Sequence, residues 1–489
     1  MAKNIMLQGT MSNVGKSFLT AALCRIFRQD GYSVAPFKSQ NMALNSFITP
    51  DGAEIGRAQA LQAEAAGISP SALINPILLK PTTDVGSQVI VNGKVRGNMR
   101  AADYFQHKKE LIPDIMTAYE ALASQHDIIV IEGAGSPVEL NLKADDIVNM
   151  GLAKLVKSPV LLVGDIDRGG VFAQLIGTLQ LLEKRENELV KGLVVNKFRG
   201  DISLFQDGID ILEKRSGKTV AGVVPYINCD IEDEDSLSEK LNARSADGVI
   251  DIAVIRLPKI SNFTDFDVFR QYSGVSVRFV SKASELGQPD MLMIPGTKST
   301  IADMKWLAEN GLAEAVKRLH SSGTPVFGIC GGYQIMGQTI SDPEGSECGG
   351  SVEGLGLLGC ETVFSNEKRQ TQVCGKFGDI SGSFSCLSGA EFYGYEVHMG
   401  ITDSNATPLT TCGGEFCGNA AGCYIHGIFD SADVSGRLIR ALYSRKELTY
   451  IGACIDRREY RNSQLDLLAD NVRKNLDMEL IYRIIEEGV

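Results

Sequence analysis

Residues 324–337 read TPVFGICGGYQIMG, an apolar run that meets a cysteine and two glycines before a helix-like segment. This order predicts a strand, a tight turn and a helix, with Cys330 at the turn. Small residues on both sides allow a strained turn that lifts the side chain above the sheet edge. The following helix supplies N–H groups and a positive dipole end, which favour a thiolate. We therefore predict a nucleophile at Cys330 in preference to a buried strand-end cysteine.

A nucleophilic cysteine needs a base, and the chain has only five histidines. His426 ends a short apolar strand and precedes a glycine, so it can reach a cysteine at a neighbouring strand end. His398, in the segment YGYEVHMG, is the alternative. We favour His426 and expect His398 to shape the pocket or to pack. A third, orienting carboxylate is not evident, and Asp430 is the nearest acid in sequence.

A second strand end is expected beside the cysteine. Residues 290–299 (DMLMIPGTKS) form an apolar strand with a Pro-Gly turn, and one helix over residues 301–320 separates it from the cysteine strand. The backbone N–H groups of Gly296 and Gly331 could then stabilise an oxyanion. This arrangement predicts attack on a carboxamide and an acyl-thioester intermediate. The other candidates for the pocket are Tyr333, Gln334 and His398.

The start of the chain predicts a nucleotide site. Residues 5–8 form an apolar strand, and residues 9–17 (GTMSNVGKS) form a small-residue loop before an amphipathic helix. The loop resembles a P-loop, although Thr10 stands where the strict G-x4-GK-[ST] pattern has glycine. Lys16 can reach the outer phosphates, and the Ser17 hydroxyl can bind Mg²⁺. The candidates for phosphate binding are Gly9, Thr10, Asn13, Gly15, Lys16 and Ser17.

Later strand ends of this half also carry polar residues. Lys38 ends a second strand, at the edge where parallel sheets bind ligands. Glu132 ends an apolar strand, where a carboxylate is costly unless paired or metal-bound, so we predict that it faces Mg²⁺, with Glu139 as a second candidate. Asn196 has the position of a base-reading residue. The irregular stretch after Lys38 adds weaker candidates for an acceptor or metal site: Asn41, Asn45, Asp51 and Glu54.

The domain organisation follows from length and pattern. A chain of 489 residues is too long for one core, and repeated strand–helix units predict an α/β fold with a doubly wound parallel sheet. An acidic, polar stretch separates this pattern from a second α/β pattern. We expect a P-loop domain, a linker, a second α/β domain with the strand–Cys–helix elbow and a C-terminal helical cap, over residues 1–235, 236–248, 249–447 and 448–489.

The net charge and the cysteine content limit the partners and the cellular compartment that are expected for this chain. The net charge of −12 makes a nucleic-acid backbone an unfavourable partner. The 11 scattered cysteines include no CxxC pair, which indicates a reducing compartment. No signal peptide and no apolar run of membrane-spanning length are evident. We expect a cytoplasmic protein with no membrane partner, and no feature of the sequence fixes an oligomeric state.

Motifs from both halves occur together in one known family. The N-terminal motifs are GTMSNVGKS, PFKSQNM, EGAGSPVELNL, DIDRGGVFA and VVNKFRGD. The C-terminal motifs are IPGTKST, FGICGGYQIMG, YGYEVHMG and YIHGIFD. In this combination the chain resembles the glutamine-hydrolysing cobyric acid synthases over nearly its whole length. The first half is similar to dethiobiotin-synthetase-like ATPases, and the second to class I glutamine amidotransferases of the cobalamin-pathway type.

The resemblance implies a reaction. It is the ATP- and glutamine-dependent amidation of the b, d, e and g carboxylates of adenosylcobyrinic acid a,c-diamide, with Mg²⁺ as cofactor and adenosylcobyric acid as product. Cys330 would be the glutaminase nucleophile and His426 its base. Ammonia would pass between the domains by a shielded route, because water at neutral pH protonates it. The chain departs from the commoner class I amidotransferase pattern, which has an acid two residues after the histidine, because that position is Ile428.

The resemblance also implies roles in the first half, and two alternatives stay open. Gly9, Thr10, Lys16 and Ser17 would hold ATP phosphates and Mg²⁺, with Glu132 and Glu139 on the metal side. The first alternative is the sister enzyme that amidates the a and c carboxylates of cobyrinic acid, which we associate with acidic residues where this chain has SQNMALN. The second is a ParA/MinD-like switch ATPase, which the first half permits and the cysteine half does not.

Overall fold

The computed structural model describes residues 2–82, 86–231, 248–454 and 456–489. The chain forms two compact units. Unit 1 contains Met1–Met42, Ala53–Ile231 and Arg461–Val489, and unit 2 contains Ala43–Gly52 and Glu232–Tyr460. Ala43–Gly52 therefore belongs to unit 2, although the expected ranges gave it to the first domain, and Arg461–Val489, expected within a separate C-terminal cap, belongs to unit 1. The predicted linker, apart from residue 248, lies outside the described residues.

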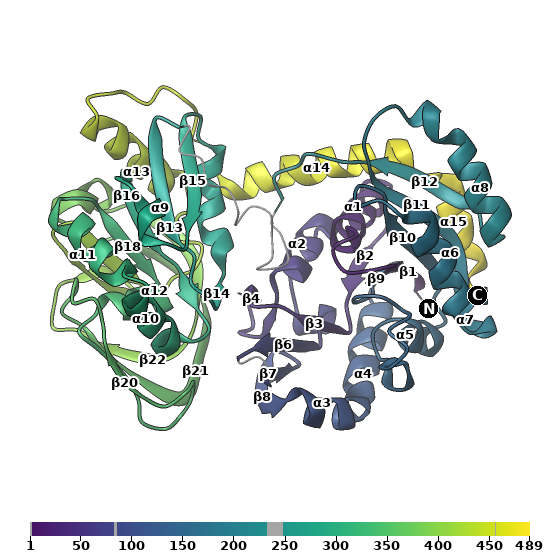
Figure 1. The fold of residues 1–489 in the computed structure, drawn as a ribbon, viewed down its shortest axis with the longest axis horizontal. Coiled ribbons are helices and arrows are strands. Elements are labelled where there is room, and N and C mark those ends of the chain that lie inside the picture. The colour runs from purple at the N-terminus through teal and green to yellow at the C-terminus, as the bar shows by residue number, and fades with distance from the viewer. Residues whose placement is uncertain (1, 83–85, 232–247, 455) are drawn as a thin grey trace. The chain divides into compact units, whose positions relative to one another are not determined.

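Unit 1 is built on a parallel sheet of six strands in the order β12-β11-β10-β1-β9-β2 (Figure 1). These strands are β1 (Lys3–Gly9), β2 (Val34–Phe37), β9 (Ile128–Glu132), β10 (Val160–Asp165), β11 (Val190–Phe198) and β12 (Val220–Pro225). A smaller sheet in the same unit contains β3 (Gln40–Met42), β6 (Ile77–Pro81), β7 (Gly86–Val91) and β8 (Lys94–Arg100). Strands β10, β11 and β12 lie side by side in chain order, as short strand–helix–strand connections favour.

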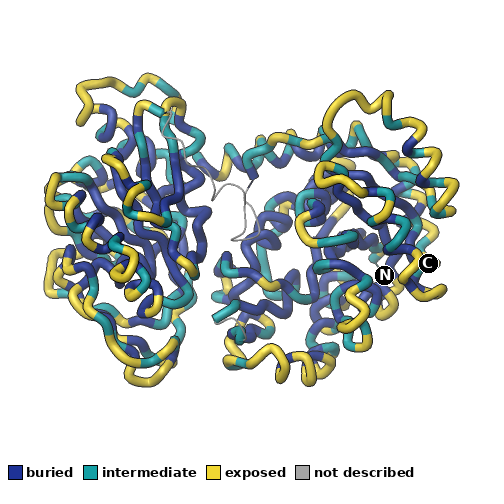
Figure 2. Tube along the Cα trace, viewed as in Figure 1, coloured by how far each residue is buried: buried dark blue, intermediate teal, exposed yellow. Residues whose placement is uncertain are grey.

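The two faces of the main sheet have separate cores. Successive side chains of a strand point to opposite faces, so Met6 and Ile131 lie in one core while Ile5 and Val130 lie in the other. Helices with buried residues cover both faces. Figure 2 colours the chain by burial, with buried residues in dark blue. The predicted doubly wound α/β fold is therefore confirmed. The helices are α1 (Lys16–Gln29), α2 (Arg57–Ala66), α3 (Ala101–His107), α4 (Ile112–Ala123), α5 (Met150–Val156), α6 (Val171–Leu181), α7 (Lys184–Leu189) and α8 (Gln206–Ser216).

The last two helices contribute to the core of unit 1. They are α14 (Arg457–Asn475), which enters unit 1 at Arg461, and α15 (Met478–Glu487). Leu465, Leu468 and Val472 recur at helical spacing and are buried in the core that also contains the apolar residues of α1. The C-terminal segment is therefore part of a core, where the sequence pattern predicted a cap on the surface.

Unit 2 is built on a seven-stranded sheet in the order β15-β13-β16-β18-β25-β24-β23, in which the first five strands are parallel. The strands are β13 (Ile250–Ile255), β15 (Val275–Val280), β16 (Met291–Ile294), β18 (Val326–Ile329), β23 (Pro408–Thr410), β24 (Gly413–Cys417) and β25 (Ala420–Cys423). A second sheet contains β19 (Thr339–Asp342), β20 (Gly350–Glu353), β21 (Glu361–Lys376) and β22 (Glu391–Asp403). The cysteine strand β18 therefore lies inside the main sheet, with strands on both sides.

The helices of unit 2 differ from the prediction at one point. The expected helix over residues 301–320 is two helices, α10 (Thr300–Glu309) and α11 (Leu312–Ser321). Gly311 separates them because its φ of +68° belongs to the left-handed region, which ends a helix. The other helices are α9 (Ala283–Leu286), α12 (Gly331–Met336) and α13 (Ala432–Arg445).

In the parts of the chain that the structure describes, none of the helices combines the length and the apolar character that crossing a membrane requires.

Candidate functional site

The loop between β1 and α1 is shaped by its close approach to β11. Gly15 has a φ of +95°, in the left-handed region that favours glycine. A Cβ at this position would lie 2.3 Å from the side-chain nitrogen of Asn196. That nitrogen donates a hydrogen bond to the carbonyl of Val14 at 2.7 Å. Asn196, a candidate base-reading residue, therefore also holds the loop in place.

Lys16 lies beneath this loop and is almost completely buried. Its Nζ donates to the carbonyl oxygens of Met11 and Gly135, each at 3.2 Å. The ammonium group is therefore held between the loop and the exit of β9 by two neutral acceptors. In a P-loop this is the position from which lysine reaches the outer phosphates.

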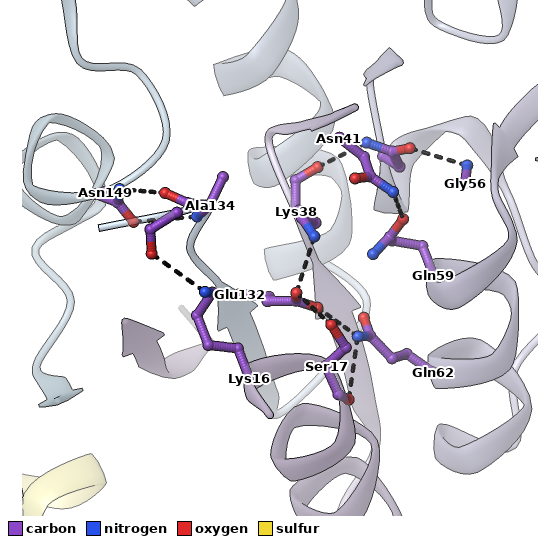
Figure 3. Close-up of polar contacts among 12 residues, drawn as sticks. Lys16, Ser17, Lys38, Asn41, Gly56, Gln59, Gln62, Glu132, Ala134 and Asn149 are labelled. Atoms are coloured by element: carbon purple, nitrogen blue, oxygen red, sulfur yellow. Dashed lines mark hydrogen bonds and ion pairs between the residues drawn. The ribbon is translucent and has the colours of Figure 1, made fainter. Parts of the chain in front are cut away.

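The carboxylate of Glu132 is buried at the end of β9 and contacts three side chains (Figure 3). Ser17 Oγ donates to its Oε1 at 2.8 Å, and Lys38 Nζ lies 2.9 Å from the same oxygen. Gln62 Nε2 donates to Oε2 at 2.5 Å. These contacts offset the desolvation of a buried charge, which amounts to several kcal/mol. The sequence did not indicate Gln62, because a glutamine inside a helix belongs to no motif.

The other loop candidates are tied to neighbouring elements. The Thr10 hydroxyl donates to Gln174 Oε1 on α6 at 3.1 Å. Asn13 has a φ of +61°, and its carbonyl accepts from Lys197 Nζ at 2.5 Å. Gly9 ends β1, where a Cβ would come within 2.5 Å of a side-chain atom in the loop. The loop is therefore fixed at the carboxyl edge of the sheet, which is where open parallel sheets bind ligands.

Two of the three predicted metal-side residues lie together. The side-chain oxygens of Ser17 and Glu132 are 2.8 Å apart, and Mg²⁺ prefers a few oxygen ligands supplemented by phosphates and waters. Glu139 lies exposed seven residues later, and no hydrogen bond or ion pair joins its carboxylate to another described residue. The described ranges contain no group of three or more His, Cys, Asp or Glu that could hold an ion alone. Ser17 and Glu132 therefore fit a nucleotide-bound Mg²⁺.

The weaker acceptor candidates after β2 separate in the structure. Asn41 Nδ2 donates to Gln59 Oε1 at 2.8 Å, within the polar group that Figure 3 shows. Glu54 forms a buried ion pair with Lys80 at 2.8 Å. The other two candidates belong to the segment of unit 2 described above, Asn45 and Asp51.

Cys330 lies at a strained turn between β18 and α12. Its φ of 53° and ψ of −112° are rare for a residue with a side chain. A Cβ on Gly332 would lie 2.0 Å from the carbonyl oxygen of Ile294 on β16, so the start of the helix packs directly on a neighbouring strand. The predicted strand–Cys–helix elbow is therefore confirmed.

His426 and Asp265 complete the site around Cys330. His426 lies close enough to Cys330 for the cysteine side chain to contribute to its raised pKa, and the imidazole Nδ1 lies 2.7 Å from Asp265 Oδ2. The N–H of Gly427 donates to the other oxygen of Asp265 at 2.9 Å. Burial alone lowers the pKa of His426, but the charge and hydrogen bond of Asp265, together with Cys330, raise this pKa to about 10. The site therefore holds an imidazolium beside the sulfur, oriented by a buried acid.

The orienting acid is far from the histidine in sequence. Asp265 lies in the 3-10 helix η6 (Phe263–Gln271), 161 residues before His426. The interpretation that pointed to Asp430, as the nearest acid, is corrected by this contact. A weak signal was present: residues 262–269 read NFTDFDVF, in which two acids alternate with apolar residues, as buried acids with a partner would.

Two predicted glycines lie close beside the sulfur–imidazole pair. Gly296 belongs to the short strand β17 (Gly296–Thr297), and a Cβ there would lie 3.2 Å from His426 Cε1. A Cβ on Gly331 would lie 2.7 Å from Thr297 Cγ2. Both positions therefore bring main chain, with no side chain, to the edge of the site, as an oxyanion hole requires.

The remaining pocket candidates gather around Tyr424. The ring of His398 stacks on it, with centroids 3.6 Å apart and an interplanar angle of 14°. Gln334 Nε2 donates to the Tyr424 hydroxyl at 3.1 Å, and Tyr333 packs edge-on at 5.4 Å. His398 is thus engaged in stacking, and the imidazole that reaches the cysteine is His426.

Each half of the chain matches one protein-family model. The CobQ/CobB/MinD/ParA nucleotide binding domain matches residues 5–238. The CobB/CobQ-like glutamine amidotransferase domain matches residues 251–434. The phosphate loop lies in the first match and the Cys330 site in the second.

Similar proteins span the full length. The cobyric acid synthase of Ruminiclostridium cellulolyticum is 53% identical, with coverage of 100% of this chain and 98% of that protein. The cobyric acid synthase of Lachnoclostridium phytofermentans is 54% identical over 100% of both chains. That of Thermoanaerobacter sp. is 48% identical over 99% of both. The chain therefore belongs to the cobyric acid synthase family, the glutamine amidotransferase ligases that carry out amidation in cobalamin biosynthesis.

Proposed function

We propose that the chain amidates the b, d, e and g carboxylates of adenosylcobyrinic acid a,c-diamide with ATP and glutamine, which gives adenosylcobyric acid. The observation that carries this proposal is the Cys330–His426–Asp265 site, with its buried His426–Asp265 pair, in a chain that also has the Glu132-centred phosphate site. The division of labour places ATP-dependent synthesis in residues 1–235 and glutamine hydrolysis in residues 249–447, and the two family matches support it.

Glutamine hydrolysis takes place at the elbow. The Cys330 sulfur attacks the carboxamide carbon while the proton of His426 passes to the leaving nitrogen, and ammonia departs as the C–N bond breaks. Water then attacks the thioester carbon, which releases glutamate and returns the sulfur and the imidazolium to their starting states. The N–H groups of Gly296 and Gly331 stabilise the oxyanion in both steps. Asp265 keeps the imidazole in the orientation that both proton transfers need.

Activation of the acceptor takes place at the phosphate loop. A corrinoid carboxylate oxygen attacks the γ-phosphorus of ATP, ADP leaves, and the resulting acyl phosphate loses inorganic phosphate when ammonia attacks its carbon. Lys16 and Lys38 offset the charge that moves across the phosphate oxygens. Mg²⁺ supplies further compensation of charge when it is bound with the nucleotide, and Ser17 and Glu132 are the donors placed to hold it.

The two alternatives make different predictions. A switch ATPase would have no use for a strained cysteine beside an imidazolium, and the full-length similarity to cobyric acid synthases does not favour it. The sister activity would amidate the a and c positions of cobyrinic acid. Neither alternative is favoured by the comparisons.

The test supplies the purified chain with ATP, glutamine and one corrinoid at a time. Mass spectrometry counts the carboxylates that have become amides on adenosylcobyrinic acid a,c-diamide and on cobyrinic acid. We expect four amidations of the diamide, their loss with a chelator and their return with Mg²⁺. Two amidations of cobyrinic acid with none on the diamide would assign the sister activity. Glutamine hydrolysis without any corrinoid product would contradict both assignments.

A further inference from the structure

A short segment of the N-terminal sequence lies in unit 2, beside the residues that hold the glutaminase site. Ala43–Gly52 belongs to unit 2, although the residues that precede and follow it belong to unit 1. The segment contains the strand β4 (Ser46–Ile48), in which Ser46 and Ile48 are fully buried. Ordering ten residues of chain in this way has an entropic cost, which specific contacts must offset. Three sets of contacts do so, and each leads to a different member of the catalytic site.

The first set leads to the imidazole through Tyr395 on β22. Its hydroxyl donates to the carbonyl of Ser46 at 2.9 Å, and Phe47 packs against its ring with centroids 5.3 Å apart. The ring of Tyr395 also stacks on the ring of His426, with centroids 5.3 Å apart and an interplanar angle of 26°. The backbones of Tyr395 and His426 also exchange hydrogen bonds of 3.1 and 2.8 Å. The segment is therefore hydrogen-bonded to Tyr395, and Tyr395 in turn holds His426 through both its ring and its backbone.

The second set leads to the orienting acid through Asn262. Its side-chain Oδ1 accepts the N–H of Ser46 at 2.9 Å. Asn262 has a left-handed φ of +50° and directly precedes η6, and its carbonyl accepts the N–H of Asp265 at 3.1 Å. The same residue of β4 therefore bonds the cap of the helical turn that carries Asp265.

The third set leads to the sulfur through Val397. Ile48 packs with Val397 and Tyr395 in one small buried cluster, and the carbonyl of Ile48 accepts from Gln372. The carbonyl of Val397 lies 3.6 Å from Cys330 Sγ. One face of β4 is thus packed on the strand whose main chain touches the nucleophile.

We propose that the segment Ala43–Gly52 positions the Cys330–His426–Asp265 site, so that rapid glutamine hydrolysis requires the segment in its place. The three catalytic side chains come from three separate elements, and hydrolysis depends on their mutual geometry. β4 is hydrogen-bonded to a direct neighbour of His426 and of Asp265, and it packs against the direct neighbour of Cys330. Because the segment continues the stretch that carries Lys38 and Asn41, the synthetase part of the sequence supplies a positioning element of the glutaminase. The inference rests on the glutaminase function proposed above.

The test removes individual hydrogen bonds between the segment Ala43–Gly52 and its neighbours, in the full-length protein. Asn262→Gly keeps the left-handed backbone and deletes the acceptor for Ser46, whereas Asn262→Asp keeps both. Tyr395→Phe keeps the ring on His426 and deletes the bond to the Ser46 carbonyl. Pro50→Ala is the matched control, since Pro50 lies exposed in the same segment. Each variant is assayed for glutamine hydrolysis and for amidation driven by added ammonia.

We expect Asn262→Gly and Tyr395→Phe to lower kcat for glutamine hydrolysis by about 10-fold or more, because small displacements at a catalytic site have effects of this size. KM for glutamine and the ammonia-driven amidation should change little, and Asn262→Asp and Pro50→Ala should behave as the unmodified protein. An unchanged kcat in both Asn262→Gly and Tyr395→Phe would overturn the inference. Loss of the ammonia-driven reaction in these variants would also overturn it, because that loss indicates a general folding defect. If the unmodified protein hydrolyses no glutamine, the proposed function itself fails.

Discussion

The imidazole of His426 and the carboxylate of Asp265 form a buried pair in which Nδ1 lies 2.7 Å from Oδ2. The two residues are 161 positions apart, and the fold brings them together beside the sulfur of Cys330. The pair explains how a histidine in an apolar setting, where burial disfavours its charged form, is nevertheless kept protonated. A protonated imidazole can both stabilise a thiolate and donate a proton to the amide nitrogen, which then leaves as ammonia.

Asp265→Asn should remove the charge that holds this proton. The charge and hydrogen bond of Asp265 help to raise the pKa of His426 to about 10. When Asp265 is removed, the burial of the imidazole remains, and burial lowers this pKa. The imidazole of the variant should therefore be neutral at pH 7. We expect iodoacetamide to alkylate Cys330 about 10-fold more slowly in the variant at pH 7, because the thiolate is the reactive form.

The pH dependence of that difference provides the control. In the unmodified protein the imidazolium persists below a pH of about 10 and is lost above it, so the gap between the two alkylation rates should close as the pH rises through this value. Mass spectrometry of the Cys330 peptide follows the reaction. Equal rates for both proteins at pH 7 would show that Asp265 does not hold the proton on His426.

Lys38→Met should destabilise unit 1. The variant leaves Glu132 buried without the cation that lies 2.9 Å from it, and removal of one partner of a buried ion pair costs about 3–5 kcal/mol. Urea unfolding measures the effect. Adding Glu132→Gln to Lys38→Met should restore much of the loss, since the unpaired charge is then gone.

The matched control for Lys38→Met is Lys109→Met. Lys109 pairs with Asp145 at 2.7 Å, but both side chains are exposed, and exposed pairs contribute little to stability. A midpoint for Lys38→Met equal to that of Lys109→Met would contradict the role given to the buried pair.

Gly15→Ala should weaken nucleotide binding. The added methyl group would lie 2.3 Å from the Asn196 amide at a φ of +95°, so the loop must move away from its present conformation. We expect the affinity for a non-hydrolysable ATP analogue, measured by calorimetry, to fall by about 10-fold or more, which corresponds to about 1.4 kcal/mol.

Gly31→Ala is the control that separates the effect of backbone strain from the effect of the close contact between residue 15 and Asn196. Gly31 follows the end of α1 with a similar φ of +92°, and no described atom lies within 4 Å of the place that its added methyl group would take. This variant should bind the analogue normally and lose only a little stability. Equal binding by the two variants would show that the contact with Asn196 is unimportant for the loop.

The features that could be predicted from the sequence are local. The elbow at Cys330 and the loop at Lys16 each lie within one short stretch, where small residues between a strand and a helix leave few conformations open. The doubly wound fold follows from strands and helices that alternate along the chain. In these cases the residues that interact are also neighbours in sequence.

The features that could not be predicted depend on tertiary contacts. Asp265 and Gln62 reach their sites from distant elements, and neither belongs to a recognisable motif. The helix break at Gly311 was hidden because glycine is tolerated within helices as well as at their ends. The segment Ala43–Gly52 leaves one unit for the other because of partners such as Tyr395, more than 300 positions away.

The central claim is that Cys330 frees nitrogen from glutamine while the loop around Lys16 activates the acceptor with ATP. The most direct measurement is corrinoid amidation by Cys330→Ser and Lys16→Ala, each with glutamine or with ammonia as the nitrogen source. The account predicts that Cys330→Ser loses the glutamine-driven reaction and keeps the ammonia-driven one, and that Lys16→Ala loses both. Full glutamine-driven amidation by Cys330→Ser would contradict it.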